Sequence, residues 1–294
     1  MGLTISGALS VVSQELRRAK FEPGPRDPEI LIEEATGRSI SELRREPGAE
    51  LTSKEQELLF RWVEELIRGV PLAYVIGNWD FWGYRFRVGP GVLIPRPETE
   101  ILVEETLKWV QQNDARRGMD WGAGTGCVGL TIALEAKVKI TLVEKSQEAL
   151  FYANENRKRL GEKFKDRDLL GRTDVLEIGV ELLSVSEPLD FIVANPPYIA
   201  LGDSRVEDSV RDYEPEEALY SGPDGLEAIR IWTQKAAEIL RPGGLWIFEI
   251  GNGQAAEAVQ CVQKTSRFRS LQVLRDLAGH ERIVSAERVE WNVL

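Results

Sequence analysis

The spacing of apolar residues in the first seventy positions predicts a small group of helices separated by turns. Residues 54–68 form the clearest helical segment, and Thr52 and Ser53 before it are residue types that begin helices. Its apolar positions are Leu58, Leu59, Trp62, Val63, Leu66 and Ile67. They recur at intervals of three and four residues, which places them on one face. Pro and Gly at residues 21–28 and 46–48 interrupt the pattern, so we expect residues 1–70 to form a helical domain.

Residues 71–97 have a different character, with aromatic and β-branched side chains between turn residues. The run from Trp79 to Val88 alternates in a way that favours a β-hairpin. We therefore predict a hairpin connector at 71–97.

Strand-like and helix-like segments alternate over residues 98–294. Strands are predicted at 119–121, 140–144, 168–171, 189–194, 244–250, 271–274 and 282–286, and helices at 98–111, 128–135, 147–160, 225–240 and 254–265. This alternation indicates an α/β class and a parallel, doubly wound sheet. Ligands bind such sheets at the carboxyl ends of the strands.

Composition places the chain among ordinary globular proteins. Its 294 residues are 43% hydrophobic and 29% charged, and no apolar run approaches a membrane span. Residues 1–10 lack the basic start and apolar run of a secretory signal. We expect a cytoplasmic protein without a membrane partner.

The formal net charge of -11 opposes nonspecific attraction to nucleic acid. Residues 1–78 carry ten Lys or Arg and thirteen Asp or Glu, a local net of -3 with no basic run. DNA or RNA is therefore the less favoured substrate, although a small basic face would still allow it.

The few cysteines and histidines restrict other chemistry. Cys127 and Cys261 lack the spacing of a zinc site, and His280 is the only histidine. A metal site built on histidines is excluded, whereas carboxylate-bound magnesium is not; we predict no metal. A nucleophilic Cys127 would have to recruit His280, so we interpret both cysteines as reduced core residues.

A glycine-rich loop follows the strand at 119–121. It reads Asp120-Trp121-Gly122-Ala123-Gly124-Thr125-Gly126, and the next strand ends eighteen residues after Gly126, at Glu144. Glycines let backbone amides approach a ligand at a helix N-terminus, and a carboxylate at the next strand end can accept both hydroxyls of a ribose. The loop predicts a nucleoside-bearing cofactor. It also fits the G-x-G-x-x-G fingerprint, so NAD and S-adenosylmethionine both remain open at this point.

The segment Asn195-Pro196-Pro197-Tyr198 follows the buried strand at 189–194. The Asn195 side-chain oxygen and the Pro196 carbonyl can accept both hydrogens of one NH2 group. Two such acceptors pull a planar nitrogen towards tetrahedral geometry and aim its lone pair at a methyl group. Tyr198 offers a flat face to the acceptor and cation–π support to a sulfonium. The segment therefore favours methyl transfer over hydride chemistry.

With these residues in place, the chain resembles the HemK/PrmC family of N5-glutamine methyltransferases, which modify the Gly-Gly-Gln motif of peptide chain release factors. The similarity runs from about residue 27 to 286. Further matching segments are Pro71-Leu72-Ala73-Tyr74-Val75-Ile76-Gly77, Pro95-Arg96-Pro97-Glu98-Thr99-Glu100, Tyr213-Glu214-Pro215, Gly222-Pro223-Asp224-Gly225-Leu226 and Phe248-Glu249-Ile250-Gly251. The segment 95–100 together with Asn-Pro-Pro-Tyr is highly specific to that family.

The resemblance implies a helical domain that docks the release factor and a Rossmann-like catalytic domain that binds S-adenosylmethionine. The cofactor residues it implies are Gly122, Ala123, Gly124, Thr125 and Gly126 for the methionine part, Glu144 for ribose, Asp174 and Val175 near adenine, and Asn195. The substrate glutamine is held by Asn195, Pro196, Pro197 and Tyr198, of which Asn195, Pro196 and Tyr198 are expected to be catalytic.

Three positions depart from the family pattern. Glu144 stands where aspartate is usual and adds one methylene, which we expect to be tolerated. Val175 replaces an aromatic residue, at the cost of a stacking contact worth about 1 kcal/mol. The sequence does not explain why Trp121 precedes the glycines. One interpretation of Arg96 is a surface ion pair with Glu98 or Glu100, and the other is a different structural or binding role. Neither assigns it a catalytic role.

The expected reaction is direct in-line methyl transfer without a covalent enzyme intermediate. An amino methyltransferase acting on a nucleic-acid base (adenine N6 or guanine N2) would use the same tetrapeptide, and acidity disfavours it. An NAD-dependent oxidoreductase lacks a residue set for hydride chemistry. A non-catalytic, translation-associated binding protein is the third alternative.

Overall fold

The computed structural model describes residues 2–19, 24–165 and 168–290. The described residues form two compact units, which are treated separately below. The first contains the residues up to Asn78 together with Val206–Tyr213, and the second contains Trp79–Arg205 and the residues from Glu214 onward.

The first unit is helical, as the apolar spacing predicts. Its helices are α1 (Ile5–Leu16), α2 (Asp27–Thr36), α3 (Ile40–Leu43), α4 (Ser53–Ile67), α5 (Leu72–Ile76) and α10 (Asp208–Tyr213). Helix α4 begins at a capping box, in which the Thr52 hydroxyl accepts from the Glu55 amide and the Glu55 carboxylate accepts from the Thr52 amide. Leu59, Val63 and Leu66 are its buried positions and pack into the core of this unit.

The interval 71–97, expected to be a hairpin connector, contains two kinds of structure. Helix α5 belongs to the first unit, while strands β1 (Asn78–Phe81) and β2 (Tyr84–Arg87) form a two-stranded sheet. Trp82 and Gly83 form the two-residue turn between them, both with positive φ. This is the geometry that a tight hairpin requires, and it makes Trp82 an unusual residue for the position.

The second unit contains a seven-stranded sheet in the order β5-β4-β3-β6-β7-β9-β8. The strands are β3 (Arg117–Trp121), β4 (Lys139–Glu144), β5 (Thr173–Glu177), β6 (Leu189–Ala194), β7 (Leu240–Glu249), β8 (Phe268–Arg275) and β9 (Glu281–Arg288). Strands β3 to β7 pair in parallel, as expected, and β9 runs antiparallel to both of its neighbours, so the sheet is mixed. A β-strand that returns through a tight turn from β8 can only pair antiparallel with it.

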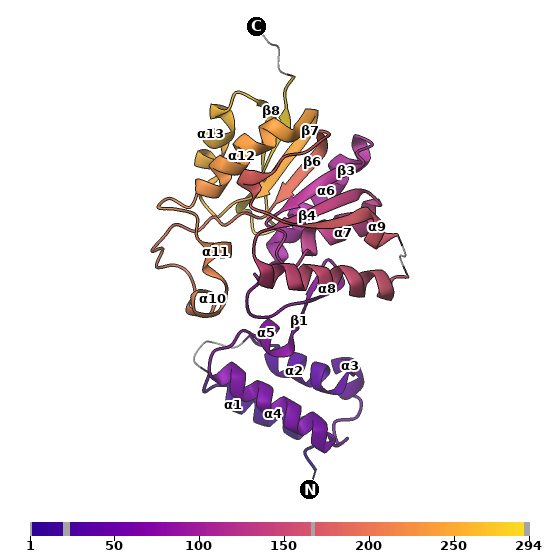
Figure 1. The fold of residues 1–294 in the computed structure, drawn as a ribbon. Coiled ribbons are helices and arrows are strands. Elements are labelled where there is room, and N and C mark those ends of the chain that lie inside the picture. The colour runs from indigo at the N-terminus through magenta and orange to yellow at the C-terminus, as the bar shows by residue number, and fades with distance from the viewer. Residues whose placement is uncertain (1, 20–23, 166–167, 291–294) are drawn as a thin grey trace. The chain divides into compact units, whose positions relative to one another are not determined.

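Helices cover both faces of this sheet (Figure 1). The long ones are α6 (Glu100–Gln112), α7 (Cys127–Ala136), α8 (Gln147–Lys163), α12 (Glu227–Ile239) and α13 (Ala255–Lys264), and the short ones are η1 (Pro97–Thr99), α9 (Leu169–Arg172), η2 (Val180–Leu182) and α11 (Glu216–Leu219). Helices α6, α7 and α8 pack on one face and α12 and α13 on the other, each with its own buried apolar cluster. The doubly wound α/β prediction is thereby confirmed.

One predicted strand is misplaced. Residues 168–171 were expected to be extended, but residues 169–172 form helix α9, and the strand β5 follows at Thr173–Glu177. Strand β5 lies at the edge of the sheet and is mostly polar and exposed, so it lacks the apolar signal that marks buried strands. The other predicted strands and the five predicted long helices overlap observed elements.

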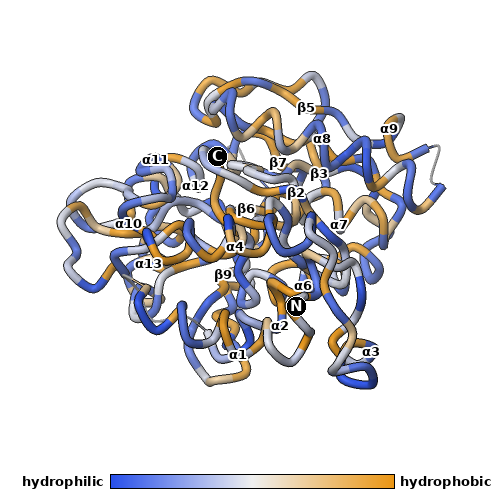
Figure 2. The backbone as a smooth tube through the Cα atoms, turned by 90° about the horizontal axis from the view of Figure 1, so that it is seen from below, coloured by the Kyte–Doolittle hydropathy of each residue, from blue (hydrophilic) through white to orange (hydrophobic). Residues whose placement is uncertain are grey.

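Polar and apolar stretches are interleaved along the helices, as the hydropathy colouring in Figure 2 shows. Within residues 2–19, 24–165 and 168–290, no helix has both the length and the apolar character needed to cross a membrane.

The packing of β3 against β6 generates a first prediction. A Cβ added at Gly118 would lie 2.4 Å from the Phe191 ring, so Gly118→Ala must displace a fully buried side chain. We expect the free energy of unfolding to fall by about 1–3 kcal/mol, measured by urea denaturation. Gly171→Ala, where no atom lies within 4 Å, is the matched control and should leave stability unchanged or raised. Equal stability of both variants would contradict this account.

Candidate active site

Strand register brings three distant segments of the chain to one edge of the sheet. Trp121 on β3 pairs with Val143 on β4 and with Ala194 on β6. The residues that follow these positions are Gly122, Glu144 and Asn195, which therefore emerge beside one another at the carboxyl ends of the strands. The chain reverses its progress across the sheet between β3 and β6, and doubly wound proteins bind ligands at such a point.

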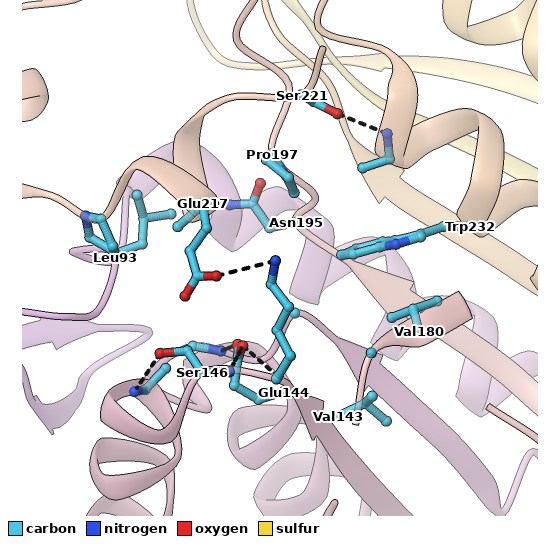
Figure 3. Close-up of a pocket in the computed structure, with 18 of the residues that line it drawn as sticks. Leu93, Val143, Glu144, Ser146, Val180, Asn195, Pro197, Glu217, Ser221 and Trp232 are labelled. Atoms are coloured by element: carbon cyan, nitrogen blue, oxygen red, sulfur yellow. Dashed lines mark hydrogen bonds and ion pairs between the residues drawn. The ribbon is translucent and has the colours of Figure 1, made fainter. Parts of the chain in front are cut away.

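A cavity of about 380 Å³ lies at this edge. Figure 3 shows Glu144 and Asn195 on opposite sides of it. Of the residues expected from sequence, those that line it are Gly122, Gly124, Glu144, Asn195 and Pro197. The size is within the range of small-molecule sites, which begin near 300 Å³.

Several other expected residues lie next to the cavity without lining it. They are Ala123, Thr125, Gly126, Pro196 and Tyr198. Thr125 and Pro196 are buried, and Gly126 precedes helix α7 as its N-cap. Their side chains shape the two loops, and the backbone of Pro196 lies between two cavity residues, Asn195 and Pro197.

The glycine loop adopts a backbone that L side chains rarely tolerate. Gly122 and Gly124 both have positive φ, at 65° and 56°. A Cβ at Gly122 would also lie 3.0 Å from the Trp232 ring. The loop can therefore turn tightly against α12 and leave its amide groups near the cavity.

Glu144 organises this loop through backbone amides. Its Oε2 accepts a hydrogen bond from Gly124 N at 2.9 Å, and its Oε1 accepts from Lys145 N at 2.8 Å and Ser146 N at 3.0 Å. A carboxylate has about four acceptor positions, so capacity for a ligand hydroxyl remains.

Asp120 is a buried carboxyl group at the start of the same loop, with 2% of its surface exposed. Its Oδ2 accepts from Gly129 N in the first turn of α7, at 2.8 Å. Burial raises the pKa of Asp120 to about 7, the Gly129 hydrogen bond opposes the rise, and the charge of Glu144 adds to it. Asp120 thereby connects β3 to α7 and fixes where the loop begins.

The residues expected near adenine are not at the cavity. Asp174 is exposed on β5 and Val175 packs against the apolar cluster on the α7 face. The reason is the position of β5: Leu176 pairs with Val143, so the strand ends after residue 177. Residues 178–181 line the cavity, and Asp174 and Val175 do not.

Asn195 is held from behind by two buried side chains that sequence reasoning assigned no role. Its Nδ2 donates to Thr99 Oγ1 at 3.3 Å, and Thr99 Oγ1 donates to Glu249 Oε2 at 2.6 Å. Glu249 follows Phe248, which pairs with Ala194, so register alone places Glu249 beside Asn195. Burial raises the pKa of the Glu249 carboxyl, although its hydrogen bonds to Thr99 and Tyr198 oppose the rise.

Tyr198 is directed towards the same carboxylate. Its hydroxyl donates to Glu249 Oε1 at 3.1 Å, and burial raises the pKa of the phenol. Its carbonyl accepts from Gln254 Nε2 at 2.8 Å. These two contacts fix the end of the tetrapeptide.

Arg96 does not pair with Glu98 or Glu100, so the surface-partner interpretation is wrong. It forms an ion pair with Glu214, whose other oxygen accepts from Ile94 N at 3.1 Å. The Glu214 side chain is 1% exposed. This contact joins the segment at 95–100 to the distant Tyr-Glu-Pro segment, which the sequence motifs present as separate.

Trp121 has a structural role. It is fully buried, and its ring contacts Trp232 edge-on at 6.2 Å and Trp246 at 5.5 Å between centroids. Trp232 lines the cavity, so Trp121 supports the cavity wall from inside the core. Such aromatic pairs contribute about 0.5–1.5 kcal/mol beyond area burial.

Lys145 and Glu217 are further cavity residues without a signal in the sequence. Their side chains form an ion pair at 3.2 Å that joins the end of β4 to α11 (Figure 3). Both side chains are about half exposed, so the ion pair contributes little to stability. It places one positive and one negative group on one side of the cavity.

The alternative chemistry of Cys127 is not supported. Burial raises the pKa of its thiol to about 12, which suppresses the nucleophilic thiolate. His280 is exposed and lies 3.5 Å from Asp276. In the part of the chain that the structure describes, no group of three or more metal-binding side chains is found.

The fold and the cavity are those of a doubly wound α/β protein with a ligand site at its strand ends, and comparison with known proteins gives the methyltransferase class and the family. Residues 98–210 match the methyltransferase small domain and residues 7–77 match the PrmC N-terminal domain. The release factor glutamine methyltransferase of Caulobacter vibrioides is 32% identical over 97% of this chain and 96% of its own length. That of Coxiella burnetii is 35% identical over 97% and 99%. The chain belongs to the release factor glutamine methyltransferase family.

Among solved structures, a 16S rRNA N2 G1207 methyltransferase of T. thermophilus has a TM-score of 0.50 at 21% identity. The match covers 72% of this chain and 49% of the length of that protein. This likeness shows the fold.

The buried Arg96–Glu214 contact generates the second prediction. Glu214→Ala removes the acceptor of Ile94 N and the partner of Arg96, so we expect the free energy of unfolding to fall by about 2–3 kcal/mol in urea denaturation. Glu214→Gln keeps one acceptor and should lose less. Glu187→Ala, which breaks an exposed pair with Arg117, is the control and should change stability by less than about 1 kcal/mol. A loss no larger than the control would refute a supporting role for Glu214.

Proposed function

We propose that this protein transfers a methyl group from S-adenosylmethionine to the side-chain nitrogen of a glutamine in a peptide chain release factor. The observation that carries the proposal is the adjacency of Gly122, Glu144 and Asn195 at the strand ends around one cavity. Membership in the family points to the same reaction. The specific residue roles given below are part of the proposal.

The hydrogen-bonding groups around the cavity match those of the cofactor. The amides of the glycine loop suit the methionine part, and the remaining acceptor position of Glu144 suits one ribose hydroxyl. Residues 178–181 replace Asp174 and Val175 as the wall for the base, with Val180 buried and Glu181 exposed. When bound, S-adenosylmethionine supplies a methyl group on a positively charged sulfur.

Asn195 and Pro196 orient the acceptor. The Asn195 Oδ1 and the Pro196 carbonyl each accept one hydrogen of the glutamine NH2, which draws the nitrogen lone pair out of conjugation with its carbonyl. Holding the acceptor in line with the methyl group accounts for much of the rate enhancement available to such a site. The transfer would break the sulfur–methyl bond and leave a neutral thioether, and the methylated nitrogen would release one proton to water. No side chain of the site needs to form a covalent bond to the substrate.

The substrate glutamine in this proposal is that of the Gly-Gly-Gln motif, and the helical residues 1–70 dock the release factor. The proposal places the protein in the cytoplasm together with this substrate. Methylation of a nucleic-acid base is not favoured, because the net charge of -11 opposes phosphate binding and the described relatives are named for release factors.

Mass spectrometry of a release factor co-expressed with this protein tests the proposal. We expect one added methyl group on the glutamine of its Gly-Gly-Gln motif, and none when Asn195→Ala replaces the wild type. Methyl transfer to rRNA or DNA with none to the release factor would replace the proposal with the nucleic-acid alternative.

Asn195→Ala removes one of the two acceptors without touching the glycine loop. We expect kcat to fall by about 10²–10³-fold, because the site loses an interaction with the reacting group. The dissociation constant for S-adenosylmethionine, measured by calorimetry, should change by less than about threefold. Turnover near that of the wild type would exclude the role of Asn195.

Glu144→Ala removes the acceptor that orders Gly124 and the strand end. We expect the dissociation constant for S-adenosylmethionine to rise by about 10–100-fold, the equivalent of roughly two hydrogen bonds. Glu177→Ala is the matched control, since Glu177 pairs with Glu144 in register but does not line the cavity. Unchanged affinity in Glu144→Ala would remove Glu144 from the cofactor site.

A further inference from the structure

Asn195 can accept a hydrogen bond from the substrate NH2 in only one of its two amide orientations. The Asn195 Oδ1 must face the cavity if it is to accept a hydrogen from the substrate NH2. The reversed amide would present its own NH2 to that of the substrate, donor against donor. Oxygen and nitrogen occupy nearly the same volume, so packing alone does not choose between the two.

A directed hydrogen-bond chain lies behind Asn195. It runs from Asn195 Nδ2 to Thr99 Oγ1 at 3.3 Å and from Thr99 Oγ1 to Glu249 Oε2 at 2.6 Å. The hydroxyl of Thr99 has a single hydrogen, which is given to the carboxylate. Its oxygen can therefore only accept from Asn195, which selects the nitrogen of the amide.

The hydrogen-bond chain ends at the buried carboxylate of Glu249. Thr99 and Glu249 are each 2% exposed. The other oxygen of Glu249 accepts from the Tyr198 hydroxyl at 3.1 Å, so both oxygens of the carboxylate act as acceptors. A buried carboxyl group is costly unless its hydrogen bonds are made, and here they run to both ends of the tetrapeptide.

We propose that Glu249 and Thr99 are positioning residues that set the amide orientation of Asn195. The proposal rests on the proposed function of Asn195 and adds to it two residues that do not line the cavity. Neither touches the substrate in this account. They act by fixing the donor-to-acceptor direction of one hydrogen-bond chain.

Thr99→Val tests this with little change in shape. Valine removes the acceptor of Asn195 Nδ2, so the productive amide orientation would leave that NH2 without a partner. We expect the reversed amide to predominate and kcat to fall at least about tenfold. Thr99→Ser restores the hydroxyl and should recover kcat to within about threefold of the wild type. KM for the release factor and affinity for S-adenosylmethionine should change by less than about threefold in both, a split that general loosening of the fold would not produce.

Glu249→Gln provides a second, independent variant. The glutamine NH2 can donate to Thr99 Oγ1, which frees the Thr99 hydrogen to donate to Asn195 Oδ1 and turns the amide nitrogen towards the cavity. We expect a loss of kcat at least as large as in Thr99→Val. Should Thr99→Val not fold, this variant decides the question by the same kcat and affinity measurements.

Thr106→Val is the matched control. Thr106 is a fully buried threonine on α6, and its hydroxyl donates to the Leu102 carbonyl, away from the cavity. Its kcat should equal that of the wild type. This separates the loss of a buried hydroxyl in general from the loss of the one behind Asn195.

The outcomes separate this proposal from the proposed function. Wild-type kcat in both Thr99→Val and Glu249→Gln, with Asn195→Ala impaired, overturns the positioning role and leaves that of Asn195 intact. A parallel fall of kcat, cofactor affinity and stability, without rescue by Thr99→Ser, also overturns it. Wild-type kcat in Asn195→Ala removes the proposed role of Asn195 and this inference with it.

Discussion

The pairing of β3 with its two neighbours is the constraint on which the site depends. Because Trp121 is level with Val143 and with Ala194, three parallel strands end at the same height, and the next residue of each faces the cavity. A shift of one residue would turn every side chain of a strand to the opposite face. The two apolar clusters on the faces of the sheet oppose such a shift, so the core and the site are specified by the same register.

Buried carboxyl groups connect the site to the rest of the second unit. Asp120 binds the first turn of α7, Glu214 binds Arg96 and Ile94 N, and Glu249 binds Thr99 and Tyr198. Each is a group whose desolvation is unfavourable, and each accepts hydrogen bonds from another segment, which for Glu214 and Glu249 is distant in sequence. Their common effect is to hold loops that would otherwise be free to move around the ligand.

The aromatic core on the α12 face has a comparable role for the cavity wall. Trp121, Trp246 and Phe248 form a continuous set of ring contacts beneath Trp232. A Cβ at Gly122 would lie 3.0 Å from the Trp232 ring, so a side chain at this position would have to displace the ring. Loop conformation and wall packing are therefore coupled, which gives a physical reason for a bulky residue directly before the glycines.

The sequence by itself determined the α/β class, the helical first unit and the two loops, because hydrophobic periodicity, glycines at a strand end and the Asn-Pro-Pro-Tyr segment are local signals. It did not locate β5, an exposed edge strand whose mostly polar residues give no apolar signal. Only the tertiary structure decided the partners of Arg96, Thr99 and Glu249, because these contacts join residues more than ninety positions apart. Local patterns carry no information on such pairs; strand register and burial do.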